Sequence, residues 1–113
     1  MQKGKVDPAI ARIHADFCRV LASATRIMII WLLADREKTV SELAEALDLS
    51  IANVSQNLRI MRDKGAVVAR KDGQKVYYHV ANRKFLEGYM MIREGIIEQT
   101  KQSLEDVSGH KVR

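Results

Sequence analysis

The chain has 113 residues, 47% of them hydrophobic, and carries a formal net charge of +5 with an isoelectric point near 9.6. This length favours one domain, residues 1–113, with limited buried surface, and the basic balance favours a polyanionic partner such as nucleic acid. The longest apolar run, residues 27–34, is far short of the roughly 20 residues that a membrane span needs. The single cysteine, Cys18, excludes an intrachain disulfide and, with an N-terminus that lacks an apolar signal core, predicts a cytoplasmic location.

The first predicted helix covers residues 8–21. Asp7 can cap it, and Pro8 is tolerated at the first helical position. Apolar residues recur along it at helical spacing and form one stripe. They are Ile10, Ile13, Phe17, Val20 and Leu21.

A second helix is predicted over residues 24–34. It contains the segment IMIIWLLA, which is apolar on nearly every side, and such a helix is typically buried all round. We therefore expect Ile27, Met28 and Trp31 to belong to the core.

Two helices joined by a tight turn follow. Residues 39–42, Thr-Val-Ser-Glu, form a capping box that starts a helix over residues 40–47. After the turn at residues 48–49, Ser50 can cap a helix that runs to about residue 64, where a glycine ends it. Ile51, Val54, Leu58 and Met61 share one side of this helix, which we expect to pack inward.

A hairpin and a long helix complete the chain. Valine-rich residues 66–70 and residues 75–80 read as strands, and Asp72-Gly73 between them is a strong hairpin turn signal. Residues 83–104 follow as the last helix. The predicted fold is mainly α with a small β-hairpin, in the order α-α-α-α-β-β-α, which is a winged helix-turn-helix.

Polar side chains occupy the outer side of the helix that follows Ser50. Amides can pair bidentately with adenine, guanidinium groups with guanine, and hydroxyls with phosphates. Basic residues outnumber acidic ones by six to two between residues 50 and 75, which favours DNA binding over an ordinary solvated surface. The predicted DNA-binding residues are Ser50, Ala52, Asn53, Ser55, Gln56, Arg59 and Arg62, with Arg70, Lys71, Gln74 and Lys75 on the hairpin.

Four short motifs resemble those of the ArsR/SmtB family of bacterial transcriptional repressors. Residues 22–26 resemble its LADPTR signature, residues 43–50 its LAxxLGLS turn, residues 54–58 its VSxHL helix and residues 73–78 its GRxVYY wing. The resemblance implies a homodimer that binds palindromic operators in double-stranded DNA and represses until an unidentified inducer arrives. It also implies that the first and last helices form the interface. The residues expected there are Ile10, Ile13, Phe17, Phe85, Tyr89, Ile92 and Ile96.

The chain departs from the family at its metal sites. Thr39 and Ser41 stand where the metal-sensor motif ELCVCDL has cysteines, and neither is a good soft-metal ligand. Of the four positions that match the last-helix site, only Glu98 keeps a suitable ligand, so that site cannot close a tetrahedral shell. Asn57 also replaces the usual histidine of VSxHL. We expect no metal and no cofactor.

Cys18 and His14 are four residues apart on the first helix, so their side chains share a face. One hypothesis is a metal or thiol sensor. The alternative is a packed, inert cysteine at a dimer interface beside an unrelated surface histidine.

The sequence therefore supports two functions from different classes. The first is a sequence-specific DNA-binding repressor. The second is a winged-helix protein-interaction module with little or no DNA reading, since this fold occurs without that activity. An enzyme is not expected, because no nucleophile–base pair, phosphate-binding loop or paired acids are evident.

Overall fold

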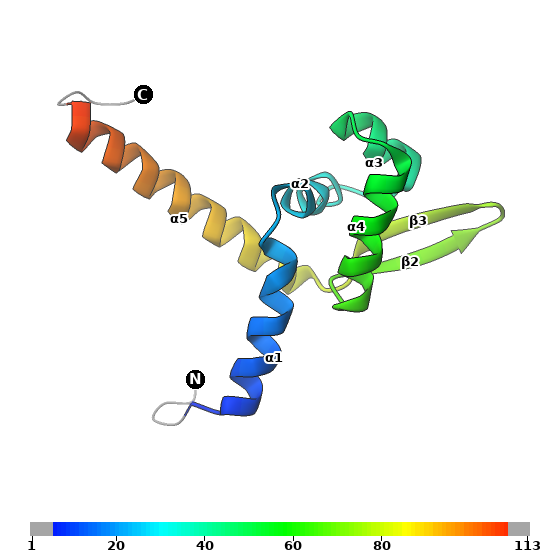
Figure 1. The fold of residues 1–113 in the computed structure, drawn as a ribbon, viewed down its shortest axis with the longest axis horizontal. Helices are drawn as coiled ribbons and strands as arrows, with labels where there is room; N and C mark the ends of the chain where they lie inside the picture. The colour runs from blue at the N-terminus through cyan, green and yellow to red at the C-terminus, as the bar shows by residue number, and fades with distance from the viewer. Residues whose placement is uncertain (1–5, 109–113) are drawn as a thin grey trace. The chain divides into compact units, whose positions relative to one another are not determined.

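The computed structural model describes residues 6–108, which form two units: residues up to Asn82 and residues from Arg83 onward. The first unit contains all elements but the last helix (Figure 1). In chain order these are α1 (Pro8–Cys18), the 3-10 helix η1 (Arg19–Leu21), α2 (Ala24–Leu32), β1 (Lys38–Thr39), α3 (Val40–Leu47), α4 (Ile51–Asp63), β2 (Val67–Asp72) and β3 (Lys75–Val80).

Side-chain caps set where the first two helices begin. Asp7 Oδ1 accepts a hydrogen bond from the Ala9 amide at 2.9 Å, and Pro8 occupies the first turn of α1. Ser23 Oγ accepts from the Arg26 amide at 3.3 Å at the start of α2. The predicted first helix is confirmed, but its last three residues tighten into the 3-10 turn η1.

The core lies where α2, α3, α4 and the base of the sheet meet. Its fully buried side chains are Val20, Ile29, Leu43, Val54, Leu58, Met61 and Val67. At the packing density of protein interiors, such positions tolerate little change in volume. The core therefore fixes the α3–turn–α4 unit against the sheet.

Three expectations about burial are wrong. Met28 and Trp31 are 44% and 46% exposed, because α3 and α4 pack on only part of the surface of α2. Ile51 is 56% exposed, because it is the first residue of α4 and precedes the turns that enter the core. Helix α2 also ends at Leu32 and not at residue 34.

The hairpin belongs to a three-stranded antiparallel sheet with the order β1-β3-β2. Thr39 lies opposite Tyr77, which in turn lies opposite Arg70. Gly73 has a φ of 63° and begins the two-residue turn, while its neighbour Gln74 keeps a negative φ. A positive φ at only the first loop residue is the pattern of a type II′ turn, so the turn residues are shifted by one from the predicted Asp-Gly pair.

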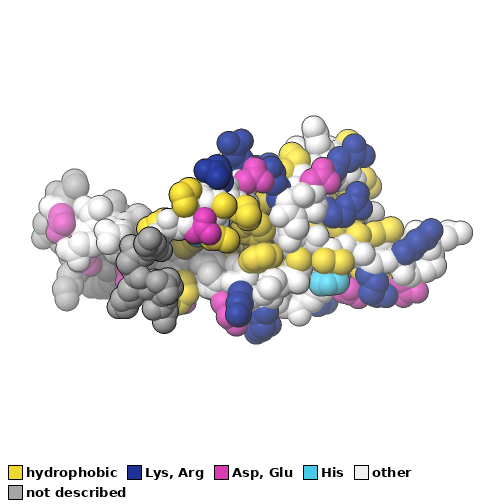
Figure 2. All heavy atoms as spheres, turned by 90° about the horizontal axis from the view of Figure 1, so that it is seen from below, with side chains coloured by type: hydrophobic (Ala, Val, Ile, Leu, Met, Phe, Trp, Pro, Cys, Tyr) yellow, Lys and Arg dark blue, Asp and Glu magenta, His cyan; other side chains and the backbone are white. Residues whose placement is uncertain are grey.

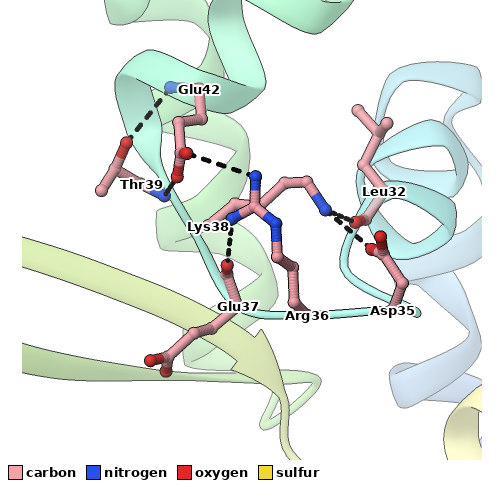
Figure 3. Close-up of polar contacts among 7 residues, drawn as sticks. All are labelled: Leu32, Asp35, Arg36, Glu37, Lys38, Thr39 and Glu42. Carbon is pink, nitrogen blue, oxygen red and sulfur yellow. Dashed lines mark hydrogen bonds and ion pairs between the residues drawn. The ribbon is translucent and has the colours of Figure 1, made fainter.

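Strand β1 was not predicted, and it changes the role of the charged segment before α3. Lys38 is buried, and its Nζ donates to the Leu32 carbonyl and, at 2.8 Å, to Asp35 Oδ1 (Figure 3). The ammonium group thus satisfies a carbonyl at the C-terminal end of α2, where a cation is favoured by the helix dipole. This segment is a structural junction between α2 and α3.

The second unit is the helix α5 (Arg83–Ser108), whose 26 residues extend past the predicted end at residue 104. Ile92 and Ile96, one turn apart, are 57% and 60% exposed. Among the residues that the structure describes, no helix combines the length and apolar character required to cross a membrane.

Candidate nucleic-acid interface

The tight turn between α3 and α4 is fixed by local hydrogen bonds. Thr39 Oγ1 accepts from the Glu42 amide at 3.2 Å while Glu42 Oε1 accepts from the Thr39 amide at 2.9 Å, which completes the predicted capping box (Figure 3). Asp48 ends α3 in the left-handed conformation with a φ of 55°. Short polar side chains tolerate that conformation better than bulky ones, so the chain can turn directly into α4.

Helix α4 presents two chemically different sides. Val54, Leu58 and Met61 are buried, as predicted. The opposite side, which we call the recognition face, is exposed at each of its members: Ala52, Asn53, Ser55, Gln56, Arg59 and Arg62. Ser50 caps the helix, because its Oγ accepts from the Asn53 amide at 3.0 Å.

All four predicted hairpin contacts are exposed, and three of them lie around the turn: Lys71, Gln74 and Lys75. Figure 2 shows lysine and arginine side chains along the hairpin, with acidic side chains and a histidine among them. Lys75 and Gln74 also line a groove of about 500 Å³ together with Thr39, Ser41 and other residues at the start of α3. The positions where metal sensors of the family have cysteines therefore adjoin the basic hairpin.

Arg70 differs from the other predicted contacts, because its guanidinium is already engaged. Its Nε donates to Glu37 Oε2 at 3.1 Å and its Nη2 to Glu37 Oε1, while Asp72 lies 3.8 Å away. The guanidinium also lies over the Tyr77 ring, 5.0 Å from its centroid, within the range of a cation–π contact. The Arg70 guanidinium holds the pKa of the Glu37 carboxyl below its usual value.

The Glu37–Arg70 pair joins residues 33 positions apart in the chain, so sequence reasoning missed it. Glu37 immediately precedes β1, and its side chain points toward the sheet in Figure 3. His79 Nδ1 is 3.9 Å from Glu37 Oε2 on the same cluster. The pairing depends on β1 lying beside β3, and no local motif reports that arrangement.

Cys18 and His14 are both exposed on α1. On the same helix, Asp16 forms an ion pair with Lys64, at the end of α4, with 2.7 Å between Oδ1 and Nζ. Within residues 6–108, no three or more His, Cys, Asp or Glu side chains gather closely enough to hold a metal ion.

The apolar residues predicted for a dimer interface lie on two helices. On α1, Ile10 and Ile13 are 61% and 67% exposed, and Phe17 is half-buried. On α5, Phe85 and Tyr89 occupy the first two turns, ahead of the exposed Ile92 and Ile96. Exposed aliphatic side chains at helical spacing on each helix are typical of a surface that another subunit covers.

Comparison with known proteins agrees with the geometry in indicating a helix-turn-helix protein. Residues 21–70 match a family model described as a helix-turn-helix domain. Over 64 residues, the chain is 44% identical to the HTH-type transcriptional regulator KmtR of Mycobacterium tuberculosis, a match that covers 57% of this chain and 49% of KmtR. Over 84 residues, it is 33% identical to a transcriptional repressor SmtB homologue of Synechocystis, a match that covers 74% of this chain and 64% of that protein. The chain thus spans between about half and just under two thirds of these relatives.

Among solved structures, the fold is similar to the homodimeric winged helix-turn-helix DNA-binding domain of Mb0332 from Mycobacterium bovis. The TM-score is 0.79 at 26% sequence identity, over 89% of this chain and 95% of that one. The helix–turn–helix, the exposed recognition face and the adjoining hairpin define a winged helix-turn-helix domain. The chain belongs to the ArsR/SmtB family of transcriptional regulators.

Proposed function

We propose that this protein is a sequence-specific DNA-binding transcriptional repressor that binds a palindromic operator as a homodimer. One observation carries the proposal: helix α4 is anchored by buried apolar residues on one side and presents amide, hydroxyl and guanidinium groups on the other. Those groups match the hydrogen-bonding edges of bases and the phosphates beside them.

In this proposal, α4 of each subunit enters the major groove and the hairpin turn contacts the flanking backbone. Two recognition helices related by a two-fold axis would read half-sites about one DNA turn, roughly 34 Å, apart. Lys71 and Lys75 would contribute charge without base preference, because contacts to phosphate carry no sequence information. A cytoplasmic location, a non-enzymatic role and the absence of a resident metal are part of the proposal.

We propose for Arg70 a different role from the DNA contact that its position in the sequence suggested. Two of its donors, Nε and Nη2, are used by Glu37, so a phosphate contact that keeps this pair would have only the remaining N–H groups. We assign it to holding the sheet, with Lys71, Gln74 and Lys75 as the hairpin's DNA contacts.

The test begins with selection of bound fragments from a random DNA library, followed by competition binding. We expect Gln56→Ala and Arg59→Ala to relax base preference and to cost about 1–3 kcal/mol at the selected site. Lys71→Ala and Lys75→Ala should weaken binding to all sequences alike and lower the salt slope by about 1. Lys101→Ala, an exposed change on α5, is the matched control and should alter neither.

Two results would contradict the proposal. Operator binding by the Gln56 and Arg59 variants that equals wild type would place the recognition face elsewhere. DNA retention that does not fall with salt would favour the protein-interaction module, because counterion release accompanies every phosphate contact.

A further inference from the structure

A chain of hydrogen bonds connects the 3-10 helix η1 to the recognition face. Arg26 on α2 donates from Nε to the Val20 carbonyl and from Nη2 to the Arg19 carbonyl, each at 3.0 Å. Its Nη1 donates to Asn57 Oδ1 on α4 at 3.2 Å. Asn57 Nδ2 donates in turn to Asn53, one helical turn earlier, at 2.9 Å to Oδ1 and 3.0 Å to the backbone carbonyl.

The chemistry of arginine fixes which groups donate and which accept along this chain of hydrogen bonds, which we call the relay. A guanidinium has five donor hydrogens and no acceptor, so the group that Asn57 turns toward Arg26 must be its oxygen. The amide nitrogen of Asn57 then points the other way and needs an acceptor. Asn53 supplies that acceptor with Oδ1, and its own Nδ2 takes part in no hydrogen bond within residues 6–108.

Burial makes the orientation persistent. Arg26 and Asn57 are half-buried, while Asn53 is exposed on the recognition face. Reversing the Asn57 amide would place its NH2 group against the guanidinium and leave an acceptor of Asn53 facing another oxygen. The mismatch at the part-buried Arg26 contact costs free energy comparable to a lost hydrogen bond.

We propose that Arg26 and Asn57 are positioning residues that fix Asn53 as a hydrogen-bond donor toward operator bases. The inference rests on the proposed function, and it replaces the expectation that Asn53 pairs bidentately with adenine. Asn53 then seeks an acceptor on a base edge, namely purine N7, guanine O6 or thymine O4, and not the adenine N6 amino group.

The position of Asn57 matters because the family usually has histidine there. A neutral imidazole carries one acceptor and one donor nitrogen, so it can in principle continue the same polarity. Aspartate can accept from Arg26 but cannot donate to Asn53, and leucine can do neither. Replacing Asn57 by each of these three residues separates the effect of its donor and acceptor arrangement from the effect of filling the site with a side chain.

The relay is first tested in the free protein, without DNA. In the NMR spectrum, Arg26→Lys and Asn57→Asp should each shift the side-chain amide resonances of Asn53, while those of Gln74 on the hairpin stay unchanged. If neither variant moves the Asn53 resonances, no relay orients that amide and the inference is wrong.

The second test uses the selected operator. Asn57→Leu and Asn57→Asp should flatten base preference at the position that Asn53→Ala flattens, by about 3- to 10-fold, the value of one hydrogen bond. Asn57→His should retain more preference than either. In the Asn53→Ala background, Asn57→Leu should change that preference no further, because its effect passes through Asn53. Preference that survives Asn57→Leu, or flattens at another position, would overturn the inference.

Base analogues identify the polarity of the contact. The acceptor atoms are deleted one at a time: N7 with 7-deazapurines, guanine O6 with 2-aminopurine and thymine O4 with 5-methyl-2-pyrimidinone. The deletion of the atom that Asn53 contacts should weaken wild-type binding at that position. Replacing adenine by purine, which lacks the N6 amino group, should not. Weakening by the purine substitution would mean that Asn53 accepts from adenine. If the wild-type protein bound no DNA, the proposed function and this inference would both be wrong. The NMR result would still show whether the relay exists.

Discussion

At the scale of single residues, several basic side chains of this protein form ion pairs within the chain. Arg70 is in the basic hairpin, but its guanidinium is held by Glu37 and covers the Tyr77 ring. Lys38 and Lys64 likewise bond to Asp35 and Asp16. The number of basic residues in a segment therefore overstates the charge that remains free to meet phosphate.

The Glu37–Arg70 pair makes a specific pH prediction. Arg70, and then His79, lower the pKa of Glu37 from its ordinary value of 4.5. Because the folded-state pKa is depressed, the stabilisation is present above the unfolded-state pKa and is lost as pH falls through the folded-state pKa. The thermal midpoint of Glu37→Gln should thus lie below wild type near neutral pH, and the gap should close as pH falls below 4.5.

Glu45→Gln is the matched control for this experiment, because Glu45 is exposed on α3 and forms no ion pair within residues 6–108. Its gap to wild type should be small at neutral pH. A Glu37→Gln gap that persists unchanged at acid pH would mean that the carboxylate charge does not hold Arg70.

At the scale of elements, two apolar residues of α4, one buried and one exposed, should differ in how much stability their truncation costs. Leu58 is 1% exposed, so Leu58→Ala should leave a cavity and cost about 2–5 kcal/mol of unfolding free energy. Ile51 lies on the same helix at 56% exposure, and Ile51→Ala should cost less than about 1 kcal/mol. Urea unfolding measures both, and equal losses would contradict the packing described for α4.

The capping box at the start of α3 gives a second element-scale prediction. Thr39→Ala removes the oxygen that accepts from the Glu42 amide and should cost about 1 kcal/mol. Thr39→Ser keeps that oxygen and should recover most of the loss. Chemical denaturation of the two variants checks this, and identical midpoints would show that the cap contributes nothing measurable.

Sequence could predict those parts of the fold that local signals encode. The cap at Ser50, the capping box and the hairpin turn signal all act within a few residues. Helices α3 and α4 begin where these signals place them, and the hairpin turn lies one residue later than its signal. Strand β1 was missed because its two residues pair with Tyr78 and Tyr77, far along the chain. The Arg26–Asn57 and Glu37–Arg70 contacts were missed for the same reason, since each spans more than 30 residues.

At the scale of the whole molecule, the main feature left to explain is the apolar surface exposed on α1 and on α5. A single chain leaves Ile10, Ile13, Ile92 and Ile96 each more than half exposed. Burying such side chains is worth roughly 25 cal/mol per Å² of apolar area, so association of two chains offers a substantial gain. A homodimer would also supply the two recognition helices that a palindromic operator requires.

The dimer is testable by placing a charge on each helix in turn. Ile13→Glu on α1 and Ile92→Glu on α5 would put an unpaired carboxylate into a buried interface, which is strongly unfavourable. Each variant should therefore shift the solution mass from twice the chain mass of 12.8 kDa toward that value in sedimentation equilibrium. Lys101→Glu introduces the same side chain at an exposed position on the side of α5 opposite Ile92 and should remain dimeric. Operator affinity should fall with the loss of the dimer, because a monomer engages one half-site and forfeits the effective concentration that links two. If both glutamate variants kept the dimer mass, the subunits would have to associate through other surfaces.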